Sequence, residues 1–247
     1  MRFRERVVIV TGAGSGIGRA TAYRFAAEGA AVAAADMSLE AAEETAKEVS
    51  RQGGRATAHR VDVAKPAEVE AAVAEILRAH GTIDVLINNA GIARDATAKK
   101  LSEADWDAVL DVNLKGTFLF CQRVIPTLSE KNRGRIVNTA SIAILGNFGQ
   151  SNYAASKAGV VGLTRTLALE LARNNVTVNC VAPGATLTPM VAKIPDHVKE
   201  QLIGRIPLKR LAEPSEIAAL HAFLASDDAA YITGQVIFCD GGVSVGA

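Results

Sequence analysis

The chain has 247 residues, of which 49% are hydrophobic and 21% charged, so it can bury one large core and is not intrinsically disordered. Its 27 Lys and Arg residues against 26 Asp and Glu give a formal charge of +1 with no long block of one sign. This balance excludes the basic surface of a nucleic-acid binder, and we expect a small-molecule partner.

Seven short apolar runs are the predicted strands, and they cover residues 7–10, 31–35, 56–61, 83–87, 135–139, 176–181 and 235–238. Such nearly continuous apolar runs are typical of parallel strands that are buried on both faces. The segments between them carry apolar residues at helical spacing, as amphipathic crossover helices do. We predict an α/β fold with one domain over residues 1–247. Its Rossmann-type, doubly wound sheet has seven mainly parallel strands with helices on both faces, and ligands bind beyond the carboxyl ends of the strands.

The helix boundaries follow from local signals. A helix over residues 19–28 follows a glycine-rich turn, and Ser102 with Asp105 is typical of a capped helix start. Pro66 and Pro214 stand where a first helical turn tolerates proline. Two longer helices are predicted over about 106–128 and 152–173.

The first strand runs into Thr11-Gly12-Ala13-Gly14-Ser15-Gly16-Ile17-Gly18. Glycines allow a tight turn and a close approach to a pyrophosphate, whose charge is favoured at a helix N-terminus. The spacing departs from G-x-G-x-x-G, so a glycine-rich turn without a ligand is the alternative. Asp36 ends the second strand, where it either accepts hydrogen bonds from an adenosine ribose or caps the next helix.

Two further strand ends are ambiguous by themselves. Asp62 and Val63 follow the third strand, as a helix entry or an adenine contact. Asn89, Ala90 and Gly91 follow the fourth strand, as a turn or as part of the same ligand site.

Tyr153 and Lys157 stand four residues apart in a predicted helix and so share one face. A nearby ammonium lowers the pKa of a phenol from about 10, as a proton-transfer group requires. Ser141 ends the fifth strand, where its hydroxyl can hold a substrate oxygen. For a lone Y-x-x-x-K match, an exposed tyrosine with an unrelated lysine is the more common case.

Together with Asn113 and Pro183-Gly184, these motifs resemble the short-chain dehydrogenase/reductase family in order and spacing, over essentially the whole chain. The nearest likeness is to its bacterial 3-oxoacyl-[acyl-carrier-protein] reductases. The resemblance implies catalytic roles for Tyr153 as general acid and base, Lys157 as its partner, Ser141 for the substrate oxygen and Asn113 in a proton relay. It implies cofactor contacts from Gly12, Gly14, Ser15, Gly16, Ile17, Gly18, Asp36, Asp62, Val63, Asn89, Ala90, Gly91, Tyr153, Lys157, Pro183, Gly184, Thr186 and Thr188.

The chain departs from those reductases at two cofactor positions. They usually carry Arg in the glycine loop and no acid after the second strand, whereas Ser15 and Asp36 stand here. A carboxylate at this place repels a 2′-phosphate. We therefore expect NAD(H) to be preferred over NADP(H).

The predicted activity is the interconversion of a secondary alcohol and a ketone, with a 3-oxoacyl reductase or 3-hydroxyacyl dehydrogenase-like substrate that includes acyl thioesters. Residues 185–206 form the predicted substrate lid, whose apolar residues are Met190, Val191, Ile194, Leu202 and Ile203. An apolar lid suits an acyl chain, an alicyclic ketone or a steroid better than a sugar. The alternatives are a dehydrogenase of an alicyclic, steroid or small secondary alcohol and, in another class, a non-catalytic nucleotide-binding scaffold.

The family is commonly tetrameric through its long helices, and the two long helices predicted here are apolar on much of their circumference. We therefore expect a homotetramer. Three isolated cysteines and four scattered histidines indicate neither disulfides nor a metal site. The apolar run at residues 7–10 is too short for a signal-peptide core, and no stretch reaches the ~18 apolar residues of a membrane span. We expect a cytoplasmic protein.

Overall fold

The computed structural model describes residues 1–192 and 195–245 of the chain. One seven-stranded sheet has the order β3-β2-β1-β4-β5-β6-β7, and every neighbouring pair is parallel. The strands are β1 (Val7–Thr11), β2 (Ala31–Asp36), β3 (Arg55–Arg60), β4 (Val85–Asn88), β5 (Gly134–Thr139), β6 (Val176–Pro183) and β7 (Val236–Cys239). The predicted doubly wound α/β fold is confirmed, and the strand ends differ from the predicted ones by at most two residues.

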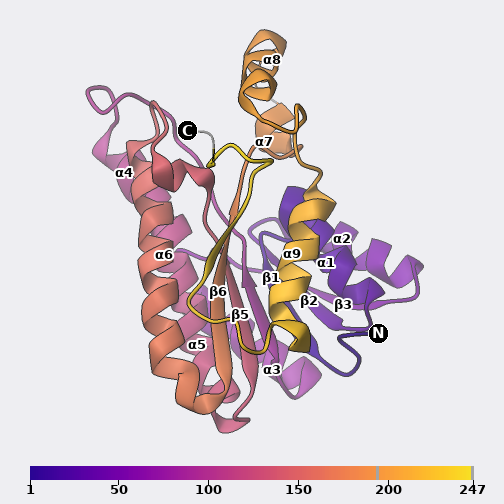
Figure 1. The fold of residues 1–247 in the computed structure, drawn as a ribbon. Coiled ribbons are helices and arrows are strands. Elements are labelled where there is room, and N and C mark those ends of the chain that lie inside the picture. Colours follow the sequence, from indigo (N-terminus) through magenta and orange to yellow (C-terminus); the bar gives the residue numbers. More distant parts are fainter. Residues whose placement is uncertain (193–194, 246–247) are drawn as a thin grey trace.

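Helices cover both faces of the sheet (Figure 1). One face carries α1 (Gly16–Ala27), α2 (Leu39–Arg51) and α9 (Pro214–Ala225), and the other carries α3 (Pro66–His80), α4 (Glu103–Leu110), α5 (Gly116–Glu130) and α6 (Ser151–Leu171). Side chains alternate along β1, so Val8 and Val10 pack with Phe25 of α1 while Val7 and Ile9 face the other layer. The strands therefore need apolar residues on both faces, which explains their continuous apolar runs.

The helix predicted over 106–128 is interrupted in the structure. A π-helical segment, η1 (Asp111–Lys115), joins α4 to α5, and its wider turn contains Asn113. Such segments occur frequently at functional sites. The start signals at Ser102, Pro66 and Pro214 are confirmed: Ser102 Oγ accepts a 3.1 Å hydrogen bond from the amide of Asp105, and both prolines occupy first turns.

The chain adds β2 and β3 on one side of β1 and then β4 to β7 on its other side, so the order of the parallel strands switches between β1 and β4. Ligands bind beyond the carboxyl ends of the strands at such a switch point. The glycine loop, the segment after β4 and the segment after β5 all lie at this edge. The predicted lid also begins there, after β6, and contains α7 (Pro189–Ala192) and α8 (Asp196–Arg205), which project from the body (Figure 1). Ile194 and the side chain of Met190 lie outside the described residues.

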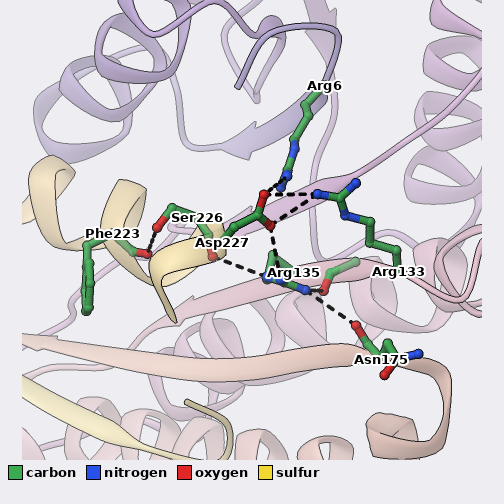
Figure 2. Close-up of polar contacts among 8 residues, drawn as sticks. Arg6, Arg133, Arg135, Asn175, Phe223, Ser226 and Asp227 are labelled. Atoms are coloured by element: carbon green, nitrogen blue, oxygen red, sulfur yellow. Dashed lines mark hydrogen bonds and ion pairs between the residues drawn. The ribbon is translucent and has the colours of Figure 1, made fainter. Parts of the chain in front are cut away.

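Ion pairs link the elements at the opposite end of the sheet, where the strands begin. Asp227, at the start of η4 (Asp227–Ala229), accepts hydrogen bonds from Arg6 at 2.7 Å, Arg133 at 3.1 Å and Arg135 at 3.4 Å (Figure 2). Arg135 is buried and also donates to the carbonyls of Gly134 and Asn175. The hydrogen bond with Arg6 contributes most to lowering the pKa of Asp227. This cluster joins β1, β5 and the end of α9 far from the ligand edge.

Across the described part of the chain, no helix is both long and apolar enough to span a membrane. The remaining short helices are η2 (Ile142–Leu145) and η3 (Ala172–Asn174). In residues 1–192 and 195–245, no group of three or more His, Cys, Asp or Glu side chains is placed to hold a metal ion.

Candidate active site

The glycine loop turns directly from β1 into α1, which begins at Gly16, three residues before the predicted start. Gly12 and Gly16 have φ angles of +66° and +51°, a region that side chains disfavour. A Cβ on Gly18 would lie 2.0 Å from the carbonyl oxygen of Gly12. These three positions therefore favour glycine, and the turn leaves the first amides of α1 at the carboxyl ends of the strands.

Thr11 joins this loop to the segment after β4. Its Oγ1 accepts 3.0 Å hydrogen bonds from the amides of both Asn89 and Ala90. The Asn89 side chain donates to the carbonyl of Thr11 at 3.1 Å. Two predicted cofactor segments thus form one unit. Sequence reasoning gave Thr11 no role of its own, although a single hydroxyl ending an apolar strand was the available signal.

Asp36 lies at the end of β2, against the glycine loop. Its carboxylate accepts hydrogen bonds from the amides of Gly14 at 2.8 Å and Ser38 at 3.0 Å. The side chain that caps α2 is that of Ser38, which accepts from Ala41 N at 3.3 Å. A carboxylate has about four lone-pair sites, so two remain for ribose hydroxyls. The arrangement fits an adenosine ribose at this place.

The side chain of Arg19 is hydrogen-bonded to α2. Its guanidinium donates to Glu44 Oε2 and to Thr45 Oγ1, both at 3.1 Å and both on α2. The cation nearest in sequence to the glycine motif is thus already paired.

Asp62 and Val63 lie between β3 and α3. Asp62 Oδ1 accepts a 3.0 Å hydrogen bond from the amide of Ala64, and Val63 is buried. These contacts are those of a helix entry, and the adenine contact stays a prediction.

Tyr153 and Lys157 share one face of α6, with Lys157 Nζ 5.7 Å from the centre of the Tyr153 ring. The buried ammonium of Lys157 donates a 2.7 Å hydrogen bond to the main-chain carbonyl of Thr139, the last residue of β5. Ser141, two residues farther on, lies near enough to Tyr153 for its hydroxyl to oppose part of the rise in the pKa of the phenol. The three predicted catalytic side chains therefore meet at the carboxyl end of β5.

The acidity of this group differs from the sequence prediction. Burial raises the pKa of Tyr153 above its usual value, and the nearby Ser141 hydroxyl acts in the opposite direction. Burial also lowers the pKa of Lys157 to about 8. The net lowering predicted for the pKa of Tyr153 is not found in this structure, because desolvation disfavours the charged forms of both groups.

Asn113 is anchored in the π-helical turn. Its Oδ1 accepts from the amide of Ile92 at 2.8 Å, and its Nδ2 donates to the carbonyl of Ile92 at 3.0 Å and to Ser156 Oγ at 3.1 Å. A Cβ placed on Gly91 would lie 3.2 Å from Asn113 Oδ1 and 3.4 Å from Lys157 Nζ. Asn113 and Lys157 therefore both lie next to Gly91. The role of Asn113 in a proton relay stays a prediction.

The segment after β6 closes the edge from the other side. The amide of Gly184 donates to the carbonyl of Cys239 at 3.0 Å, and Thr186 Oγ1 donates to the carbonyl of Gly184 at 3.0 Å. Thr188 faces the glycine loop, since a Cβ on Gly16 would lie 3.1 Å from its Cγ2. Pro183 ends β6 at the same place.

These positions fit a dinucleotide that runs from Asp36, past the amides of the glycine loop, to Lys157. The glycines of the loop leave little room for a Cβ, the carboxylate keeps free acceptor sites, and the lysine and tyrosine lie at the far end. Beyond the predicted set, the structure adds Thr139 and Ser156 as anchors of Lys157 and Asn113.

Known proteins resemble the chain over its whole length. A family model described as enoyl-(acyl carrier protein) reductase matches residues 12–244. The chain is 47% identical over 246 residues to a 3-oxoacyl-[acyl-carrier-protein] reductase FabG of Thermotoga maritima, covering 99% of this chain and 100% of the relative. It is 47% identical over 245 residues to the (2S)-[(R)-hydroxy(phenyl)methyl]succinyl-CoA dehydrogenase subunit BbsD of Thauera aromatica, covering 99% of each chain. The crystal structure of levodione reductase superposes with a TM-score of 0.96 at 41% identity and covers 100% of both chains.

Proposed function

Because the chain belongs to the short-chain dehydrogenase/reductase family, we propose that it interconverts a ketone and a secondary alcohol with NAD(H), on an acyl thioester or a related β-keto compound. The chain is an oxidoreductase of this family, which uses nicotinamide cofactors. The matched relatives are named as reductases or as a dehydrogenase, which does not favour the non-catalytic scaffold.

The proposal rests on one observation, the proximity of Tyr153 to both Ser141 and Lys157 at the carboxyl end of β5. In the reductive direction, the Tyr153 phenol donates a proton to the substrate oxygen, and the Ser141 hydroxyl orients and polarises that oxygen. The bound cofactor supplies or accepts the hydride. In the oxidative direction, Tyr153 accepts the proton.

Lys157 and Asn113 support this proton transfer. The ammonium of Lys157 stabilises charge that develops on the phenol oxygen and binds the nicotinamide ribose. Asn113, fixed by Ile92 and Ser156, lies near enough to Lys157 to hold a water that carries protons from solvent. The remaining site residues of the glycine loop and of the segments after β3, β4 and β6 bind the cofactor.

We assign the preference for NAD(H) to Asp36. Its carboxylate faces the ribose position with two acceptor sites unused, and a 2′-phosphate there meets like charge. Ser15 offers no cation, and Arg19 is engaged by Glu44. These contacts support NAD(H) over NADP(H).

The acyl thioester is the substrate class that two of the named relatives share, one bound to a carrier protein and one to coenzyme A. An acidic carrier protein needs a basic surface on which to dock, but Lys131 already pairs with Asp84 and Arg133 already pairs with Asp227. The proposal therefore does not need a carrier protein. The similarity to levodione reductase supports an alicyclic ketone as the alternative substrate.

The lid of residues 185–206 is proposed to cover the acyl group. It is attached at both ends, since Leu187 N donates to the carbonyl of Ala212 at 2.9 Å and Lys209 Nζ donates to the carbonyl of Gly204 at 2.6 Å. We further propose a homotetramer, since Trp106, Phe118 and Leu169 expose apolar side chains on the layer of α4, α5 and α6.

A steady-state assay tests the proposed function. The purified protein is given NADH with a β-keto ester, a β-ketoacyl-CoA or an alicyclic diketone, and cofactor absorbance is followed. We expect NADH oxidation with the β-keto compounds. Turnover of the diketone alone selects the alternative substrate, and no turnover in either direction with any ketone or its alcohol contradicts the proposed activity.

A further inference from the structure

His221 of α9 lies wholly inside the protein between α1 and β5. Its Nδ1 is 3.1 Å from Thr21 Oγ1 of α1, and its Nε2 is 3.2 Å from Thr139 Oγ1 of β5. The buried residues around it on α9 are apolar: Ile217, Ala218, Ala222 and Leu224. A polar ring is costly in such surroundings unless both nitrogens are hydrogen-bonded, and here both are.

The neighbouring groups determine the direction of each hydrogen bond. Thr21 Oγ1 donates its one proton to the carbonyl of Ile17 at 2.7 Å, so it must accept a proton from His221 Nδ1. Burial lowers the pKa of His221 to about 3, so the ring is neutral near pH 7 and its Nε2 is an acceptor. The Thr139 hydroxyl therefore donates to Nε2.

Thr139 connects this ring to the active site. Its side chain is hydrogen-bonded to His221 of α9, and its carbonyl accepts a hydrogen bond from the Lys157 ammonium of α6. Helices α9 and α6 lie on opposite sides of the sheet (Figure 1). A chain of polar groups thus runs from the carbonyl of Ile17, in the first turn of α1 beside the glycine loop, across the sheet to Lys157. Ser141 follows Thr139 by two residues, so the same strand end holds two predicted catalytic side chains.

We propose that His221 is a positioning residue for the reaction: its hydrogen bond orients Thr139, whose carbonyl holds the Lys157 ammonium beside Tyr153. This role rests on the proposed function. It also links the glycine loop mechanically to the catalytic lysine, since the chain ends at Ile17. Small errors in the position of a catalytic group are costly in rate, so one buried hydrogen bond at this place affects turnover.

Kinetics of single and double variants test this role. His221→Leu and Thr139→Val each remove the hydrogen bond between the two side chains, and each is expected to lower kcat about tenfold with the KM for the ketone unchanged. Thr139→Ser keeps the hydroxyl and should recover kcat to within about twofold of the parent. The kcat of the double variant should equal that of the less active single variant, because both substitutions remove the same hydrogen bond.

The control is Thr177→Val in β6, which removes a buried hydroxyl for which the described residues provide no hydrogen-bond partner. Its kcat should equal that of the parent. Additive losses in the double variant, or a parent-like kcat in His221→Leu, would show that His221 only packs the core.

A second measurement does not depend on activity. Nitrogen NMR of protein labelled in its histidines, with the His221 signals assigned by their loss in His221→Leu, should show the Nδ1–H tautomer from pH 8 to pH 5. An Nε2–H tautomer, or titration near the ordinary pKa, overturns the hydrogen-bond chain. A parent without activity on any ketone contradicts the proposed function and leaves the tautomer result intact, whereas an active parent with unaffected variants contradicts only the positioning role.

Discussion

The amide of Gly14 donates a 2.8 Å hydrogen bond to the carboxylate of Asp36, which fixes the end of β2 against the glycine loop. A Cβ on Gly14 would lie 2.8 Å from the same carboxylate oxygen, so the contact requires glycine. The cofactor preference therefore depends on a carboxylate whose position the loop itself determines.

We predict that NADH exceeds NADPH in kcat/KM by about 30- to 1,000-fold, since a lost charge-assisted hydrogen bond and like-charge repulsion amount to roughly 2 to 4 kcal/mol. Asp36→Ser combined with Ser15→Arg should narrow or reverse this ratio. Both are measured with one ketone. Equal or greater efficiency with NADPH in the parent would overturn the role assigned to Asp36.

Replacing Tyr153 by Phe removes one oxygen with little change in volume. Turnover should fall by at least ~100-fold, the contribution of a positioned proton donor, while NADH binding measured by fluorescence titration stays close to that of the parent. Tyr231→Phe, at an exposed position, is the matched control. Retained turnover in Tyr153→Phe would reject the mechanism.

The pH dependence of ketone reduction should report Lys157. Burial lowers its pKa to about 8, so the ammonium is charged below that pH and neutral above it, while the raised pKa of Tyr153 keeps the phenol protonated. We expect kcat/KM to fall as the pH rises through about 8. In Lys157→Arg the arginine side chain stays charged at high pH, so the remaining activity should no longer decline above about pH 8. An unchanged decline in that variant would assign the decline to another group.

The oligomeric state is tested by light scattering. We expect a particle of four 25.8 kDa chains. Leu169, 82% exposed on α6, should lie in a subunit contact, so Leu169→Glu should dissociate the assembly. Leu39→Glu, on the opposite layer, is the control. A parent that stays monomeric at every concentration contradicts the prediction.

The arginine cluster at the other edge of the sheet predicts a stability effect without a catalytic one. Asp227→Asn leaves buried Arg135 without its carboxylate partner and should lower the free energy of unfolding by about 1–2 kcal/mol, a modest value because Asp227 itself is largely exposed. Asp228→Asn, next to it and also exposed, should have little effect. Urea unfolding measures both, and kcat should change in neither.

The sequence by itself determined the strand pattern, the glycine loop and the shared face of Tyr153 and Lys157. These features depend on local rules: alternation along a strand, φ angles that glycine adopts, and the spacing of a helical turn. A complete set of motifs in one order also determined the family, which the relatives confirm. The ends of strands were predictable to within two residues for the same reason.

Only the tertiary structure decided the contacts that join distant segments. Thr139 and His221 are 82 residues apart and Thr21 and His221 are 200 apart, so no spacing in the sequence predicts that they meet. The π-helical turn at Asn113 and the direction of the pKa shift of Tyr153 were likewise outside local reasoning. The desolvation that shifts a pKa depends on every element packed around the side chain, so it is set only when the layers have packed together.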